Sequence, residues 1–158
     1  MPNILIVCTA NICRSPVGEV VLRDSLRKQG LTDWSVASAG TWAEPNRNAA
    51  AFSRQLMAAQ GHNLEDHRSR MVSEEDLAAA DLVLVMEMGH AEALRAEFPQ
   101  YANKVYLLSE MAGPRYSVTD PYGGPLEAYQ EMVTELTTLI DKGLPRIMQL
   151  AQANRVNV

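Results

Sequence analysis

Cysteine is scarce in this chain of 158 residues: only Cys8 and Cys13 occur, and both lie close to the N-terminus. No cysteine follows them, so a disulfide cannot close a long loop, and a disulfide-stabilised scaffold is excluded. Long apolar runs are also missing, since the run at residues 4–7 is far too short to span a bilayer and no basic segment precedes it. We therefore expect a reduced, cytoplasmic protein without membrane insertion.

Basic side chains are the minority among the charged ones, with 14 Lys and Arg against 19 Asp and Glu and a net charge of -5. Nucleic acids and anionic membranes select broad basic faces, so this balance argues against both as main partners. It leaves room for a single local anion site. Hydrophobic residues make up 47% of the chain, which is typical of a globular protein, and the length fits one domain over residues 1–158.

Short apolar runs alternate with segments of helical periodicity along the chain. Strands are predicted at residues 4–7, 34–39, 82–86 and 104–108, and the first and third read as buried on both faces. Helices are predicted at residues 15–29, 48–60, 91–98 and 126–150, with a short acidic turn from Ser73, a break near Gly143–Pro145 and a frayed tail at 151–158. This alternation predicts an α/β fold: a four-stranded parallel sheet with helices on both faces.

A constellation suited to an anion follows the first strand. Cys8 and Arg14 are separated by five residues, and Ser15-Pro16 then gives a helix start, with Ser as the expected N-cap. A helix start offers unpaired N–H groups, and an arginine fork can hold two phosphoryl oxygens. The same field favours the thiolate form of Cys8, which is a nucleophile for phosphorus. The sequence therefore predicts a phosphate-binding loop at the carboxyl end of the first strand.

A plainer interpretation of the same residues makes Cys8 a small buried hydrophobe and Arg14 a solvated surface charge. The spacing alone is common by chance and favours that interpretation. The strand before the loop and the helix start after it favour the anion site, and the glycines and lysine of a nucleotide-binding loop are absent.

The segment Cys-Thr-Ala-Asn-Ile-Cys-Arg-Ser-Pro at residues 8–16 resembles the signature of the low-molecular-weight protein tyrosine phosphatases. The resemblance extends over nearly the whole chain, through Ser-Ala-Gly-Thr at 38–41, His67 with Arg70, and Asp-Pro-Tyr at 120–122. It implies an enzyme that hydrolyses phosphotyrosine through a cysteinyl-phosphate, without a metal or other cofactor.

The resemblance also implies the residues of the site. Cys8 matches the nucleophile, Arg14 the phosphoryl clamp and Asp120 the general acid and base. Without the first loop, a turn residue is the favoured interpretation of Asp120, because Asp-Pro-Tyr-Gly-Gly is favourable turn chemistry. The loop that would bind the phosphoryl group comprises Thr9, Ala10, Asn11, Ile12, Cys13, Arg14 and Ser15.

A supporting hydrogen-bond network is implied for Asn11, Ser15, Ser38 and His67, with Asn11 in a left-handed conformation that Asn tolerates well. The Ser15 hydroxyl would also stabilise the Cys8 thiolate. Ala10 stands where the family usually has Gly, and a positive φ at that position would carry a cost for Ala.

Three side chains are implied as walls of the substrate pocket: Ile12, Trp42 and Tyr122. An apolar residue at position 12 suits a tyrosine ring, whereas relatives that act on phosphoarginine carry Thr there. For Trp42, partial core packing is the alternative. Cys13 matches a cysteine that can form a reversible disulfide with the nucleophile, which would protect a reactive thiolate from irreversible oxidation; a small packing residue is the alternative.

The expected partners are phosphotyrosine proteins, among which a tyrosine kinase is one candidate, and phosphate or vanadate should inhibit. Three other functions share these motifs: an arsenate reductase, a phosphocarrier domain and a phosphopeptide-binding module without catalysis. A thiol-relay reductase needs downstream cysteines, a carrier needs no general acid, and a binding module needs no intact Cys8, Arg14 and Asp120. The three histidines show no metal-ligand spacing. The oligomeric state stays open.

Overall fold

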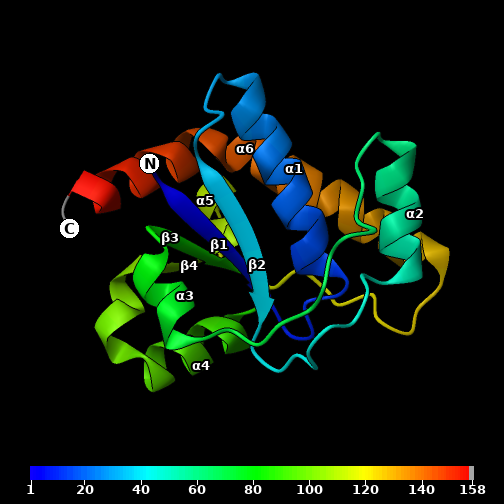
Figure 1. Cartoon of the computed structure of the whole chain (residues 1–158), viewed down its shortest axis with the longest axis horizontal. Helices are drawn as coiled ribbons and strands as arrows, with labels where there is room; N and C mark the ends of the chain where they lie inside the picture. Colours follow the sequence, from blue (N-terminus) through cyan, green and yellow to red (C-terminus); the bar gives the residue numbers. More distant parts are fainter. Residues whose placement is uncertain (157–158) are drawn as a thin grey trace.

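The centre of the molecule is a sheet of four parallel strands, seen in Figure 1. The computed structural model describes residues 1–156. The strands β1 (Asn3–Cys8), β2 (Ser35–Gly40), β3 (Leu82–Val85) and β4 (Val105–Leu107) lie in the order β2-β1-β3-β4. β1 and β3 occupy the middle, and this position explains why both are continuous apolar runs.

Helices cover both faces of the sheet, which confirms the predicted fold class. α1 (Arg14–Lys28), α5 (Leu108–Ala112) and α6 (Leu126–Val156) pack on one face, where Ile4 and Ile6 are buried. α3 (Glu74–Ala79) and α4 (Met88–Glu97) cover the other, where Leu5 and Val7 are buried. α2 (Ala51–Ala59) packs beside α6, and the 3-10 helix η1 (Pro99–Lys104) leads into β4. No helix of the described chain is long and apolar enough to cross a membrane.

The predicted break near Gly143–Pro145 and the frayed tail are wrong, because α6 runs without interruption to Val156. An interior proline costs a helix about 3 kcal/mol. Burial of Ile147 and Ala151, both fully buried, offsets that cost and carries the helix past Pro145. Nearer the end, the Asn154 side chain donates to the carbonyl of Asp81 at 2.7 Å. Residues 157–158 of the expected tail lie outside the described residues.

Other helix boundaries differ from the sequence prediction in ways that follow from local contacts. α1 begins at Arg14 with Cys13 as its N-cap, so Ser15 lies within the first turn, and its hydroxyl turns toward Cys8 instead of capping. α4 begins three residues earlier than expected, α2 begins at Ala51 rather than at residue 48, and α5 was missed because five residues show no readable periodicity.

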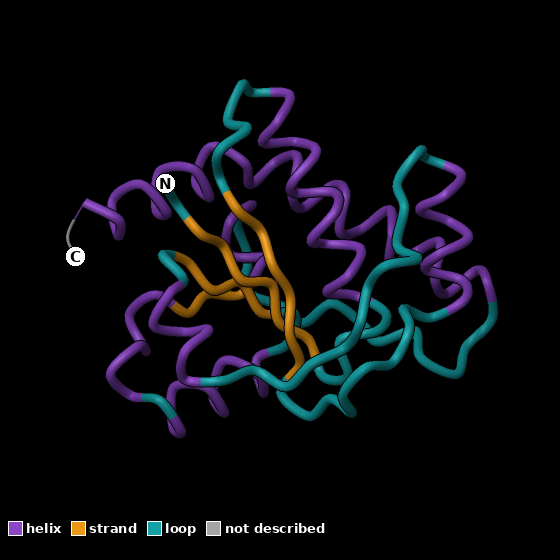
Figure 2. Tube along the Cα trace, viewed as in Figure 1, coloured by secondary structure: helices purple, strands orange, loops and turns teal. Residues whose placement is uncertain are grey.

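The loops that follow the strands gather at one edge of the sheet, as Figure 2 shows. Parallel strands end together, and ligands of α/β sheets bind at that edge. The loop after β1 meets there with the segments after β2 and β3 and with the long segment after α5.

Candidate active site

The loop after β1 wraps around the Cys8 side chain, which is 2% exposed at the end of the strand. Neighbouring segments pin this loop: Thr41 N–H donates to the carbonyl of Cys8 at 2.9 Å, and Trp42 N–H donates to that of Thr9 at 3.0 Å. The first turn of α1 follows directly, and its N–H groups have no intrahelical acceptors. The Cys8 side chain therefore lies beside the positive end of the α1 dipole.

Asn11 organises the loop, and its φ of 60° is the left-handed conformation expected from the sequence. Its Oδ1 accepts from the N–H of Arg70 at 3.0 Å, so its Nδ2 faces Ser15 Oγ at 2.8 Å and Ser38 Oγ at 3.0 Å. His67 Nε2 donates to the carbonyl of Asn11 at 2.7 Å. The structure thus brings together all four side chains of the expected network.

The hydrogen bonds of this network connect the Glu19 carboxylate to the Cys8 thiol. Ser38 Oγ donates to the Glu19 carboxylate at 2.7 Å and accepts from Asn11. Ser15 Oγ also accepts from Asn11, so its own hydrogen is left to donate to Cys8 Sγ, 3.0 Å away. A hydrogen bond to a thiolate favours the charged form. Glu19, which sequence analysis missed, anchors the chain at its far end.

Ala10 carries no backbone penalty in this loop. Among the described residues other than glycine, a positive φ occurs only at Asn11 and Asn46. Ala10 is therefore compatible with the loop, although Gly is usual there. Glycine is required instead at Gly40, where a Cβ would collide with the carbonyl oxygen of Thr9.

Arg14 is 1% exposed and its guanidinium lies at the bottom of the site. Nη1 makes an ion pair with Glu87 Oε2 at 2.8 Å and donates to the carbonyl of Val118 at 2.8 Å, and Nη2 lies 3.5 Å from Asp120 Oδ2. Nε is buried and has no hydrogen-bond partner in the described chain. A buried N–H without an acceptor is costly, and a bound phosphoryl group would offer an oxygen as the acceptor that the Nε lacks.

Asp120 lies at the mouth of the same site, with its side chain 42% exposed. Its Oδ1 accepts from the N–H of Tyr122 at 3.1 Å, so it is also the turn residue that its sequence context predicts. A small pocket joins the loop to this turn. Its lining residues are Cys8, Ala10, Ile12, Cys13, Arg14, Asp120 and Tyr122.

The aromatic side chains expected at the pocket differ in position. Tyr122 lines it and is 62% exposed, whereas Trp42 is 81% exposed and is not among the lining residues. The structure therefore excludes core packing for Trp42, whose exposed side chain belongs to the segment after β2 that is hydrogen-bonded to Thr9. Ile12 is buried and lines the pocket.

Cys13 lies under the loop and is 3% exposed. Burial raises the pKa of its thiol to about 11, and the Tyr129 hydroxyl, 3.5 Å from Sγ, opposes part of that shift. The Cys13 thiol is thus neutral near neutral pH, and its reversible disulfide with Cys8 stays a prediction. Tyr129 in turn packs edge-on against Phe52 of α2, so the loop, α2 and α6 form one buried contact.

Sequence analysis missed Glu87 and His90, which reach the site from the start of α4. Glu87 pairs with Arg14, and His90 Nε2 lies 2.7 Å from Thr9 Oγ1. One signal was available: both residues follow a buried strand, and strands of a parallel sheet end at a common edge. Their pairing with residues more than seventy positions away depends on the sheet order, which the sequence does not state.

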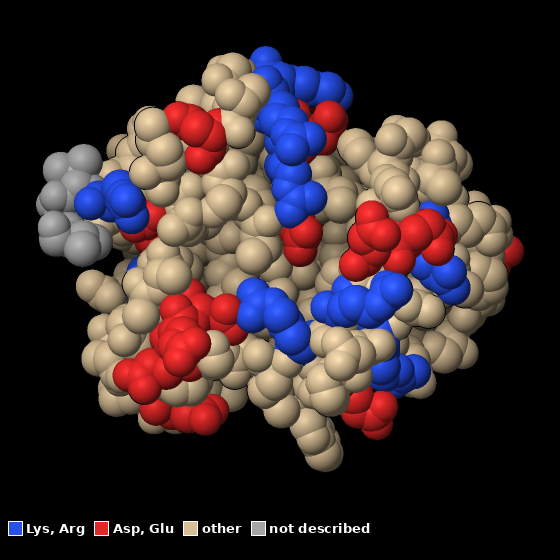
Figure 3. Space-filling view, in the orientation of Figure 1, with Lys and Arg blue, Asp and Glu red and all other residues tan. Residues whose placement is uncertain are grey.

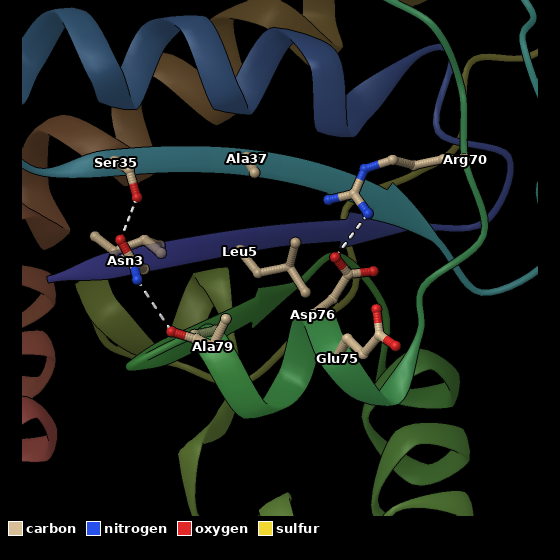
Figure 4. A pocket seen from close by; sticks show the side chains of 10 residues that line it. Asn3, Leu5, Ser35, Ala37, Arg70, Glu75, Asp76 and Ala79 are labelled. Carbon is tan, nitrogen blue, oxygen red and sulfur yellow. Dashed lines mark hydrogen bonds and ion pairs between the residues drawn. The ribbon is translucent and has the colours of Figure 1, made fainter. Parts of the chain in front are cut away.

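A second hollow, about 300 Å3, lies over the other end of the sheet, and Figure 4 shows it between β1, β2 and α3. Arg70 reaches across it to Asp76, with 2.7 Å between Nη1 and Oδ1. Cys8, Arg14 and Asp120 do not line this hollow. Its link to the site is structural, because the backbone N–H of Arg70 holds Asn11.

Charges of both signs are distributed over the face of the molecule drawn in Figure 3, with acidic side chains over α3 and α4 and basic ones along α1. No broad basic surface covers this face. Positive charge at the loop is local instead, and comes from the buried fork of Arg14 and the N-terminus of α1.

Known proteins share the sequence pattern and the fold of this chain. The sequence model of the low molecular weight phosphotyrosine protein phosphatases matches residues 3–155. The chain belongs to this family. The crystal structure of a low molecular weight protein tyrosine phosphatase from T. tengcongensis superposes with a TM-score of 0.87 at 37% identity, covering 92% of this chain and 99% of that one.

Relatives within the family differ in the substrate that their names state. A protein-arginine-phosphatase of Bacillus subtilis is 34% identical over 139 residues, covering 87% of this chain and 91% of that protein. A probable low molecular weight protein-tyrosine-phosphatase, EpsP, of Ralstonia nicotianae is 33% identical over 148 residues, covering 94% and 97%. Overall similarity therefore does not separate a tyrosine from an arginine substrate.

Proposed function

We propose that this phosphatase hydrolyses phosphotyrosine in proteins through a cysteinyl-phosphate on Cys8. The observation that carries the proposal is the buried Arg14 fork, whose Nε lacks an acceptor, in a pocket that Cys8 and Asp120 also line. A guanidinium and helix N–H groups bind the phosphoryl oxygens, and the thiolate approaches phosphorus from the loop side.

In the first step Cys8 Sγ forms a bond to phosphorus as the bond to the tyrosine oxygen breaks. Asp120, at the mouth of the pocket, gives a proton to the departing phenolate. Arg14 and the N–H groups of the loop stabilise the charge on the three equatorial oxygens. The products of this step are the unphosphorylated tyrosine side chain of the substrate protein and the cysteinyl-phosphate.

In the second step a water molecule attacks the phosphorus and Asp120 accepts its proton. The bond between Cys8 Sγ and phosphorus breaks, and the Ser15 hydroxyl stabilises the thiolate that departs. Inorganic phosphate is released, so phosphate and vanadate, which copies the five-coordinate geometry, should inhibit competitively. EDTA should have no effect.

Ile12 supports the preference for a tyrosine ring, because its apolar side chain lines the pocket. Apolar contact stabilises a bound phenyl ring. The polar guanidine of phosphoarginine would instead be stabilised by a hydroxyl that forms a hydrogen bond with it. Tyr122 offers a second aromatic surface at the mouth. The substrates would be phosphotyrosine proteins, such as a tyrosine kinase, in the cytoplasm.

A substrate panel with one matched variant tests the choice. Wild-type protein and Ile12→Thr are given phosphotyrosine, phosphoserine and phosphoarginine peptides of the same sequence. We expect the wild type to prefer phosphotyrosine by at least about tenfold in kcat/KM, and Ile12→Thr to shift the preference toward phosphoarginine. A wild-type preference for phosphoarginine would overturn the substrate while leaving the cysteine chemistry intact.

A further inference from the structure

His90 is a buried histidine at the start of α4, 6% exposed, whose two ring nitrogens both have partners. Nδ1 lies 3.1 Å from the backbone N of Glu87, which can only donate. Nδ1 therefore accepts, and the proton of the neutral ring is on Nε2. Nε2 lies 2.7 Å from Thr9 Oγ1, so the ring donates to the threonine hydroxyl.

Thr9 connects this histidine to the phosphate clamp. Its Oγ1 accepts from His90 and also lies 3.4 Å from Nη2 of Arg14. His90 and Arg14 thus each use one lone pair of Oγ1, and these two contacts fix the rotamer of Thr9. Nη2 is the nitrogen on the Asp120 side of the guanidinium, 3.5 Å from Oδ2.

The two carboxylates beside Arg14 make such a restraint useful. Glu87 holds Nη1 at 2.8 Å, and Asp120 attracts Nη2 from an exposed turn. If the Arg14 guanidinium turned toward Asp120, its Nε and Nη2 would point away from the phosphoryl oxygens. It would also form an ion pair with the carboxyl group that is needed to protonate the leaving group. An acceptor at Thr9 opposes that rotation.

We propose that His90 is a positioning residue: through its Nε2–H it orients Thr9, and through Thr9 it holds the Arg14 fork in register with the phosphoryl group. The inference rests on the proposed function, in which Arg14 binds phosphate. His90 itself touches neither the substrate nor the thiol. Its fixed tautomer, set by the backbone of Glu87, supplies a donor that does not reorient when phosphate binds.

A purely structural role is the competing explanation, since the contact between His90 and Glu87 also joins the first turn of α4. That role would lower thermal stability and would not change the affinity of the folded site for a transition-state analogue. A positioning role changes that affinity, and it does so only while Thr9 carries its hydroxyl. The affinity for vanadate and its dependence on Thr9 therefore separate the two roles.

The experiment measures kcat on an aryl phosphate and the inhibition constant of vanadate for His90→Ala, His90→Gln, Thr9→Val and the double variant Thr9→Val/His90→Ala. We expect His90→Ala to lower kcat and to weaken vanadate by about tenfold each. His90→Gln, which keeps an N–H donor at the same reach, should recover most of both. The double variant should be no worse than Thr9→Val, because His90 acts through Thr9.

His62→Ala is the matched control, since His62 lies in a separate cleft beside α1 and α6 and should keep wild-type kinetics. Vanadate inhibition of His90→Ala equal to that of the wild type would overturn the inference, as would independent, multiplying losses in the double variant. If the wild type itself neither hydrolyses the aryl phosphate nor binds vanadate, the proposed function fails and the inference fails with it.

Discussion

The floor and the rim of the candidate site are built in opposite ways. The floor, from Cys8 to Ser15, is mostly buried. Other segments hold its Asn11 and Arg14 side chains by hydrogen bonds and an ion pair, and Asn11 in turn holds the Ser15 side chain. The rim comprises exposed side chains with few contacts to the rest of the protein: Asp120 and Tyr122 at the pocket, and Trp42 in the segment after β2.

This difference assigns different tasks to the two regions. Fixed donors around a nucleophile act without reorganisation during the reaction, so a rigid floor serves phosphoryl transfer on any substrate. Exposed side chains on a turn and a loop cost little to change, and they meet the part of the substrate that differs between proteins. Changes in the floor should therefore affect all substrates, and changes in the rim should depend on the substrate.

Asp120 is the rim residue to which the proposed function gives a chemical role, and Asp120→Ala should give the largest loss among the rim variants. We expect kcat to fall about a hundredfold or more for phosphotyrosine peptides, and much less for aryl phosphates whose phenol needs no proton to leave. Kinetics on a series of leaving groups measures the difference. Equal losses across the series would remove Asp120 from the acid role.

Ser38→Ala tests the floor at a residue that does not touch substrate. It removes a hydroxyl that accepts from Asn11 and donates to Glu19. We therefore expect the unfolding free energy to fall by about 1–2 kcal/mol, and the activation free energy of the reaction to rise by a similar amount for every substrate. Denaturant unfolding and kinetics check both numbers. Ser25→Ala, in the separate cleft beside α1 and α6, is the matched control. A substrate-dependent loss for Ser38→Ala would contradict the division between floor and rim.

The pH dependence of stability reports on the neutral His90, which contacts the floor at Thr9. Burial, together with the Arg14 charge and against the attraction of Glu87 and Asp120, lowers the pKa of His90 from 6.5 to about 4. The unfolded chain thus binds more protons between these values, and the unfolding free energy should fall as pH drops from about 6.5 to about 4.

The His90 contribution is on the order of 2 kcal/mol across that interval. His90→Gln, which does not titrate, should show a correspondingly smaller decrease when both proteins are unfolded by urea at a series of pH values. Parallel curves for the two proteins would show that His90 titrates normally in the folded state.

Trp42→Ala should have the smallest effect, since the indole is 81% exposed. We expect unchanged hydrolysis of a small aryl phosphate and a KM raised a few fold for a phosphotyrosine protein, because only the protein reaches the rim. Steady-state kinetics on the two substrates decides this. A loss of kcat on the small substrate would place Trp42 in the floor instead.

The sequence alone predicted the sheet and the loop because their signals are local. An apolar run, a Cys and Arg spaced by five residues and a helix start all fall within residues 4–16. The partners of Arg14 were not predictable in the same way: Glu87 and Val118 approach it only after β3 has paired with β1. The continuity of α6 was missed for a similar reason, since buried contacts of Ile147 and Ala151 outweigh the local effect of Pro145.

Trapping the phosphoenzyme tests the central claim most directly. Asp120→Ala is mixed with an aryl phosphate that has a good leaving group, quenched in acid within the first turnover, digested and analysed by mass spectrometry. We predict one phosphoryl group on the peptide that contains Cys8, and none when Cys8→Ala is treated in the same way. Rapid release of the phenol with no phosphate on Cys8 at any quench time would contradict the account.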